Sequence, residues 1–227
     1  MYYVETLNYT DLAYNSKKDQ YISTKAPLPA FVLIPGYVAA KKVGIKPQFV
    51  ALLQSTIIGL CSIAVVFYTC KLCTSERSSY IATVAYAYGS LIPINAIIFQ
   101  SHIYAAFFIS CAMYAHLTSR HILVGFFIGL SAFCEPILLT AYLAFFIAAK
   151  TNKKRFAIIL GAIFPILCIS LYNIWTFGAP WDFPYQHSIK YSNTPAFEIE
   201  GVLRVLAILC ALVLFTPVFL FFIYIKK

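Results

Sequence analysis

The sequence predicts an all-α fold, a polytopic transmembrane bundle of about seven helices in which several helices are short or broken by proline. Two observations favour this fold. Apolar and aromatic residues make up 61% of the 227 residues and charged residues only 11%, whereas a soluble domain has about 25% charged residues. Several apolar stretches are also about 20 residues long, enough to cross the hydrocarbon layer of a bilayer. This composition excludes a disordered tail, a coiled coil and an ordinary cytosolic enzyme.

Seven apolar segments follow one another along the chain, and we expect each to be a membrane span. They cover residues 27–40, 48–70, 79–100, 102–119, 122–149, 156–176 and 205–225. The first segment is short and contains three prolines, which predicts a bend, and the fifth has Glu135-Pro136 at its middle. The chain therefore divides into a polar tail, residues 1–26, and a transmembrane domain, residues 27–227, with an outer loop at 177–201.

The net charge of +9 indicates how the segments are oriented in the membrane. Nine Lys and Arg residues and no acidic residue lie in 41–47, 150–155 and the last two positions. Because cytoplasmic loops carry the excess of Lys and Arg, we expect these three regions, including the C-terminus, to be cytoplasmic. The tail and the 177–201 loop then face outward. We expect a multi-pass protein of the plasma membrane whose partner is the lipid bilayer, and no nucleic acid, because the basic residues only separate apolar segments.

Three elements carry polar chemistry near the expected membrane surfaces. Lys25 precedes Pro27, where a lysine can hold a lipid phosphate or simply mark the interface before a helix-starting proline. Residues 172–185 combine a Gly-Pro turn with aromatic side chains, which can line a sugar or headgroup site or form an ordinary aromatic belt. Glu135 is a carboxylate inside an apolar segment, and such a residue is either functional or hydrogen-bonded locally beside Pro136.

Spacing argues against a metal site built from histidine or cysteine. His102 and His116 lie about 21 Å apart on one helix, so they cannot share a metal ion, and each is expected at a helix end. Cys70 and Cys73 form a C-x-x-C pair with no second pair and no nearby His pair to complete a zinc site. We interpret them as helix-end cysteines, with a redox or metal half-site as the alternative.

Four short segments occur in a characteristic order over residues 21–185. They are Tyr21-Ile22-Ser23-Thr24-Lys25-Ala26-Pro27, Ala85-Tyr86-Ala87-Tyr88-Gly89-Ser90, Phe99-Gln100-Ser101-His102, and Tyr172-Asn173 followed by Phe177-Gly178-Ala179-Pro180 and Tyr185. In this order they resemble the C-type integral-membrane glycosyltransferases, in the branch of the protein O-mannosyltransferases and the aminoarabinose transferase of lipid A.

The resemblance implies a polyprenyl phosphate-linked sugar donor and sugar transfer on the outer face. It implies that Lys25, together with Tyr21, contacts the donor phosphate. We expect the other polar and aromatic candidates to line the cavity; these are His102, Glu135, Asn173, Trp175, Trp181, Asp182 and Tyr185.

The family's first helix, the acid at its outward end and its C-terminal part have no counterpart that we can assign in this sequence. The catalytic residue therefore stays unassigned, and so does the cofactor, for which a divalent metal is one alternative. The main alternative to an enzyme is a non-catalytic small membrane subunit of a larger complex. A small solute transporter is a third, based on the broken helices and Glu135.

Overall fold

The computed structural model describes residues 12–15, 20–23 and 27–182. The chain divides into two compact units, residues 1–24 together with 185–227, and residues 25–184. In the first unit, strands β1 (Leu12–Asn15) and β2 (Gln20–Ser23) pair antiparallel, with Tyr14 opposite Tyr21. The expected polar tail therefore contains a β-hairpin, and its aromatic and β-branched residues favour that extended pairing.

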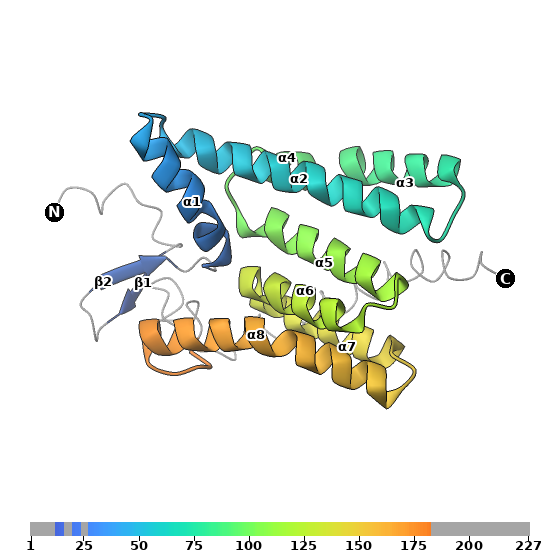
Figure 1. Ribbon diagram of the computed structural model, residues 1–227. Helices are drawn as coiled ribbons and strands as arrows, with labels where there is room; N and C mark the ends of the chain where they lie inside the picture. Colours follow the sequence, from blue (N-terminus) through green and yellow to red (C-terminus); the bar gives the residue numbers. More distant parts are fainter. Residues whose placement is uncertain (1–11, 16–19, 24–26, 183–227) are drawn as a thin grey trace, which may run out of the picture. The chain divides into compact units, whose positions relative to one another are not determined.

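Within residues 25–184 the described chain is helical, as the composition predicts. In order, its elements are α1 (Leu28–Lys42), α2 (Pro47–Lys71), α3 (Glu76–Gly89), α4 (Ile92–Ala96), α5 (Ser101–Leu117), α6 (His121–Cys134), the 3₁₀ turn η2 (Pro136–Leu138), α7 (Leu139–Ala148) and α8 (Asn152–Phe177) (Figure 1). Prolines stand in the first turns of α1, α2, α4 and η2, where a missing N–H costs no helical hydrogen bond.

The helices of this unit run back and forth between two ends (Figure 1). One end holds the start of α5 and the ends of α6 and α8, and we call it the Glu135 end. The opposite end holds the end of α2, the α5–α6 loop and the start of α8, and we call it the Ser119 end.

Helix α1 does not traverse the unit, in contrast to the span expected at 27–40. Its Phe31 ring lies 6.1 Å from the rings of both Phe133 and Tyr172, and its Gly36 packs against Val50 near the start of α2. The basic loop at 41–46 therefore lies at the Glu135 end, whereas 150–155 lies at the Ser119 end (Figure 1). We expected these two loops to share one side of the membrane; in the structure they lie at opposite ends of the bundle, because α1 is a short helix that starts and ends near the same end.

The expected span at 122–149 is likewise two antiparallel helices, α6 and α7. Proline disfavours helical backbone in the residue before it, and Glu135 is accordingly extended, with φ −143° and ψ 101°. The chain reverses there, and α7 returns so that Phe145 and Ala149 join Val124 in one buried apolar cluster. The segment at 79–100 also divides, into α3 and α4, so the continuous hydrophobicity of both segments concealed their breaks.

Helices α6 and α8 run parallel at very close range. A Cβ atom added at Gly125 would lie 1.8 Å from the Ile158 carbonyl oxygen, and one at Gly161 would lie 1.9 Å from the Ile122 oxygen. One turn further on, a Cβ at Gly129 would lie 2.7 Å from Pro165 Cβ. Only residues without a side chain permit this approach, as in the small-xxx-small contacts of membrane helices.

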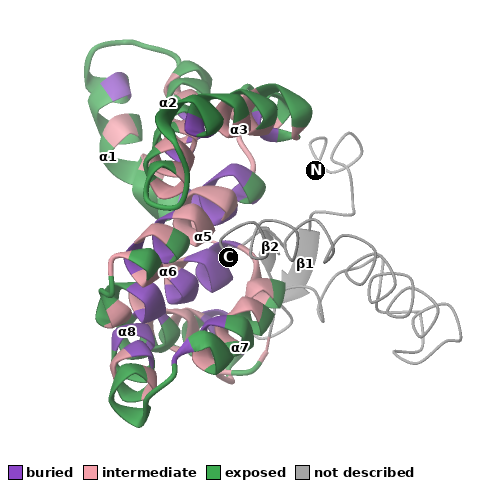
Figure 2. Cartoon of the chain, turned by 90° about the vertical axis from the view of Figure 1, so that its right-hand side faces the viewer, coloured by how far each residue is buried: buried purple, intermediate pink, exposed green. Residues whose placement is uncertain are grey.

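Burial increases toward the centre of the helical unit (Figure 2). Residues of α5 and α6 such as Ile103, Tyr104 and Ile128 are fully buried, whereas large apolar side chains on α2 and α8 point outward. Among the described helices, α2 with 25 residues and α8 with 26 are long and apolar enough to cross a membrane, and both suggest a membrane protein.

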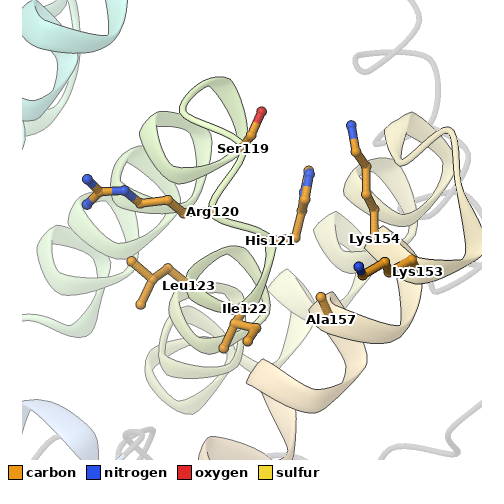
Figure 3. Close-up of a pocket in the computed structure, with 8 residues that line it drawn as sticks. All are labelled: Ser119, Arg120, His121, Ile122, Leu123, Lys153, Lys154 and Ala157. Atoms are coloured by element: carbon orange, nitrogen blue, oxygen red, sulfur yellow. The ribbon is translucent and has the colours of Figure 1, made fainter.

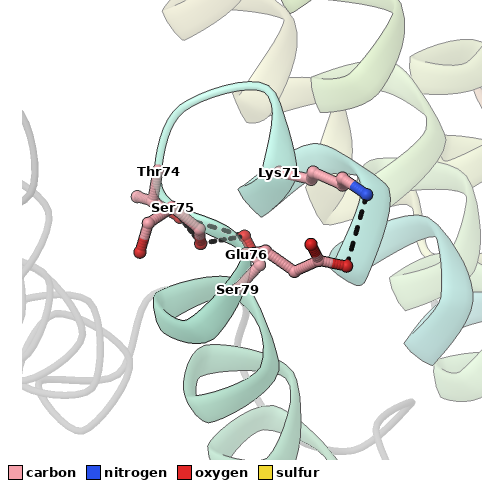
Figure 4. A network of polar contacts seen from close by, with 5 residues as sticks. All are labelled: Lys71, Thr74, Ser75, Glu76 and Ser79. Carbon is pink, nitrogen blue, oxygen red and sulfur yellow. Dashed lines mark hydrogen bonds and ion pairs between the residues drawn. The ribbon is translucent and has the colours of Figure 1, made fainter.

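A polar network closes the turn between α2 and α3 at the Ser119 end (Figure 4). Ser75 caps α3 by accepting a hydrogen bond from the Ser78 amide, and Lys71 Nζ lies 3.5 Å from Glu76 Oε1. Cys70 stands in the last turn of α2 and Cys73 in the turn that follows, both as free thiols, and the Cys73 amide donates to the Cys70 carbonyl. This arrangement agrees with helix-end cysteines.

Candidate functional site: a carboxylate cluster at the Glu135 end

The candidate site forms where the reversal at Pro136 meets the first turn of α5. Because Glu135 leaves the helix at this point, its side chain reaches α5, which begins at Ser101. The Ser101 hydroxyl donates a hydrogen bond to Glu135 Oε1. His102 Nδ1 lies 2.9 Å from the same oxygen, so two consecutive residues of α5 hold one carboxylate.

The start of α5 favours a negative charge at this position. The first amides of a helix have no partners within it, and its dipole places partial positive charge there. The Glu135 side chain is only 16% exposed and that of His102 is 58% exposed. The carboxylate is thus shielded and held in place, while the imidazole is accessible from outside the bundle.

The cluster of Ser101, His102 and Glu135 lies closer to the centre of the bundle than the nearby ends of the two long helices, α2 and α8. Gly129 packs against Pro165, and since α6 and α8 run parallel, Glu135 is level with a position about six residues before the end of α8. At 1.5 Å per residue this is about 9 Å. Gln54 of α2 contacts Tyr104 of α5. Gln54 stands seven residues after the start of α2 and Tyr104 three residues after the start of α5, so α2 extends about four residues, or about 6 Å, beyond the cluster.

Asn173 lies at the same end of the bundle and supports the turn that follows α8. It is buried, and its Nδ2 donates to the Pro180 carbonyl at 3.0 Å. Gly178 ends the helix with φ 98°, a left-handed conformation that glycine adopts without strain. Its amide donates to the Asn173 and Ile174 carbonyls. The side-chain amide of Asn173 therefore stabilises the turn that follows α8.

The two tryptophans that we expected to line the site lie on the surface near this turn. Trp175 and Trp181 are each 72% exposed, which is typical of aromatic residues at a membrane interface. Asp182 follows directly, and its amide donates to the Ala179 carbonyl at 3.3 Å.

Three predicted site residues are not placed by the structure. Lys25 and Tyr185 lie outside the described residues, and Tyr21 is described only by its backbone in β2. Of the residues predicted to line the site, the structure therefore brings His102 and Glu135 into direct contact.

Sequence reasoning missed two features of this site. It did not identify Ser101 as a hydrogen-bond donor to the Glu135 carboxylate, and it did not pair His102 with Glu135. No local pattern carries this information, because the two positions meet only after α6 has run back along α5. In the described part of the chain, no group of three or more His, Cys, Asp and Glu side chains is arranged to hold a metal ion.

Comparison with known proteins gives no match: no family model, no curated protein and no solved structure is similar to this chain.

Proposed function

We propose that the chain is a multi-pass membrane protein whose Glu135 end faces outward. The outward apolar side chains of α2 and α8 support placement in a bilayer. Six successive traverses, by α2, α3–α4, α5, α6, α7 and α8, together with the expected span at 205–225, give seven crossings. This count leaves the N-terminal tail outside and the C-terminus in the cytoplasm.

The charge distribution supports this orientation. The Ser119 end carries most of the cations of the described helical unit: Lys71, Arg77, Arg120, Lys150, Lys153, Lys154 and Arg155. The Glu135 end has Lys41, Lys42 and Lys46. Since Lys and Arg concentrate on the cytoplasmic side, the Ser119 end is the cytoplasmic one.

We further propose that the protein is glycosyltransferase-like and binds a polyprenyl phosphate-linked sugar at the Glu135 end. The observation that carries this proposal is the contact between His102 and Glu135 inside the ends of α2 and α8. A carboxylate at such depth is costly and is by default functional. A carboxylate and an imidazole together offer hydrogen-bond acceptors and donors to sugar hydroxyls, and the carboxylate has the chemistry of a general base.

The position of Leu28 supports a role for Lys25 in binding the donor phosphate. Leu28 packs against the buried cluster that includes Ile103 and Cys134, the neighbours of His102 and Glu135. Three residues span at most about 11 Å, so covalent geometry keeps Lys25 within reach of this end. An ammonium group there pairs with a phosphate while the sugar extends toward Glu135.

The test compares two glutamates at opposite ends of the unit, Glu135 beside His102 and Glu76 beside Lys71. The full chain is reconstituted in nanodiscs, and binding of a radiolabelled polyprenyl phosphate hexose is measured for Glu135→Gln and Glu76→Gln. A hydrogen bond to a charged group contributes about 1.5–3 kcal/mol, so Glu135→Gln and Lys25→Ala should each weaken binding about tenfold or more. Glu76→Gln should bind like the unchanged protein.

Equal donor binding by Glu135→Gln and Glu76→Gln would show that the cluster is not the sugar site. Release of the labelled sugar to an acceptor identifies a transferase. Binding without transfer favours the alternative, a non-catalytic subunit that presents the lipid-linked sugar within a larger membrane complex.

A further inference from the structure

A second candidate site lies at the Ser119 end, away from Glu135 and His102. A pocket of about 530 Å³ opens where the α5–α6 loop meets the first turn of α8 (Figure 3). Its lining includes Arg120, His121, Lys153 and Lys154 as polar residues and Ile122 and Leu123 as apolar ones. Figure 3 shows His121 between the two lysines of α8 and Arg120, which extends to the other side.

Within the described part of the chain, the cations of this pocket have no acidic partners. The ion pairs among the described residues are Lys71–Glu76 and His102–Glu135, and neither includes a residue of the pocket. Neighbouring Arg155 behaves differently, because its Nε donates to the Ala149 and Phe146 carbonyls at the end of α7. Lys153 and Lys154 can therefore bind an anionic ligand, whereas Arg155 stabilises the end of α7.

Three further features of the pocket favour an anion. Lys153 and Lys154 stand in the first turn of α8, where the helix dipole disfavours cations and a bound anion would offset the repulsion. Helix α6 begins at His121, and no described side chain caps it, so its first amides are available to an acceptor. Both ring nitrogens of His121 are also buried without a hydrogen-bond partner among the described residues.

The apolar part of the lining favours an amphiphilic ligand. Ile122 and Leu123 are exposed, and beyond the pocket the exposed face of α8 continues with Phe156, Ile159 and Leu160. A ligand with its anionic group between the lysines can thus lay hydrocarbon chains along this face. Basic pockets between membrane helices on the cytoplasmic side are suited to anionic headgroups in this way.

We propose that this pocket binds the phosphate group of an anionic phospholipid. The proposal rests on the placement of the protein in a membrane and is independent of the sugar donor at the Glu135 end. The phosphate oxygens accept hydrogen bonds from Lys153, Lys154 and the first amides of α6. Arg120 lies at the rim.

Native mass spectrometry of the full chain, released from nanodiscs of phosphatidylglycerol and phosphatidylcholine, tests this site. We expect the unchanged protein to retain phosphatidylglycerol. The Lys153→Gln, Lys154→Gln variant should retain it about 25-fold more weakly, because each basic residue beside an anionic lipid strengthens binding about fivefold and the two effects multiply.

The matched control is the Lys41→Gln, Lys42→Gln variant, which removes two adjacent lysines at the Glu135 end and should retain the lipid. A Lys153→Arg, Lys154→Arg variant keeps the charge and should also retain it, which separates loss of the site from loss of folding. A second arm measures binding of inorganic phosphate in phosphatidylcholine nanodiscs. If inorganic phosphate binds and this binding depends on Lys153 and Lys154, the pocket accepts a soluble phosphate as well as the phosphate of a lipid.

Equal retention of phosphatidylglycerol and phosphatidylcholine by the unchanged protein, with no lysine-dependent binding of inorganic phosphate, overturns the proposal. Equal loss in the two Lys→Gln variants also overturns it, because the effect would then follow from net charge alone.

Discussion

Basic residues that are close together in the sequence make different contacts at the turns of this bundle. Arg155 and Lys153 belong to one basic run, yet of the two only Arg155 donates hydrogen bonds to the last carbonyls of α7 in the described chain. Its guanidinium carbon also lies 5.4 Å from the centre of the Phe146 ring. Cationic side chains at a helix C-terminus satisfy carbonyls that the helix leaves unpaired.

Arg155→Gln should therefore lower the free energy of unfolding by about 1.5 kcal/mol, the lower end of the range for hydrogen bonds to charged groups, because the side chain is only half-buried. Lys153→Gln should leave this free energy nearly unchanged. Thermal unfolding of the two variants in detergent, followed by tryptophan fluorescence, measures the difference. Equal midpoints would mean that the Arg155 contacts contribute nothing to stability.

At the scale of elements, the parallel contact between α6 and α8 should be the most sensitive to added volume. A methyl group at Gly125 or Gly161 would meet a backbone carbonyl at less than 2 Å, and backbone cannot rotate away as a side chain can. Overpacking typically costs about 1–3 kcal/mol. Gly125→Ala and Gly161→Ala should each lower the unfolding midpoint clearly.

Gly89→Ala is the matched control, because a Cβ at that position meets nothing within 4 Å and alanine favours the helix more than glycine does. It should leave the midpoint unchanged or raise it. If Gly125→Ala is as stable as Gly89→Ala, the two helices are separated further than the structure places them.

The helices that could be predicted from the sequence are those with long, uninterrupted apolar runs. The segment expected at 48–70 is α2 (Pro47–Lys71), and the one at 102–119 is α5 (Ser101–Leu117). The reversal at Pro136 could not be located in this way, because apolar residues continue on both sides of it. The contact between His102 and Glu135 depends on that reversal and was hidden for the same reason.

For the whole molecule, the position of α1 changes the expected orientation of the loops. If α1 does not cross, residue 43 lies on the same side of a membrane as residue 179, and residue 153 lies on the other. Single-cysteine variants Val43→Cys, Ala179→Cys and Lys153→Cys, made in a cysteine-free background, should follow this pattern. An impermeant thiol reagent applied outside the cell should label the first two and spare the third.

Protection of both Val43→Cys and Lys153→Cys, with Ala179→Cys labelled, would restore the arrangement expected from loop charge alone, with α1 as a full crossing. Loop charge favours that arrangement because both loops are basic, whereas the length and packing of α1 favour the other.

The brevity of α6 and α7 has a consequence for the lipid around them. Helix α6 has 14 residues and α7 has 10, so they measure about 21 Å and 15 Å, against about 37 Å for α2. In the membrane placement that we propose, the exposed side chains of α7, Leu143 and Ile147 among them, would meet a hydrocarbon layer about 30 Å thick. Hydrophobic mismatch of this size is relieved by thinning the bilayer beside the shorter helix. The protein would therefore carry a thin sector of membrane on its α7 side, where the lipid headgroups descend toward the level of Glu135.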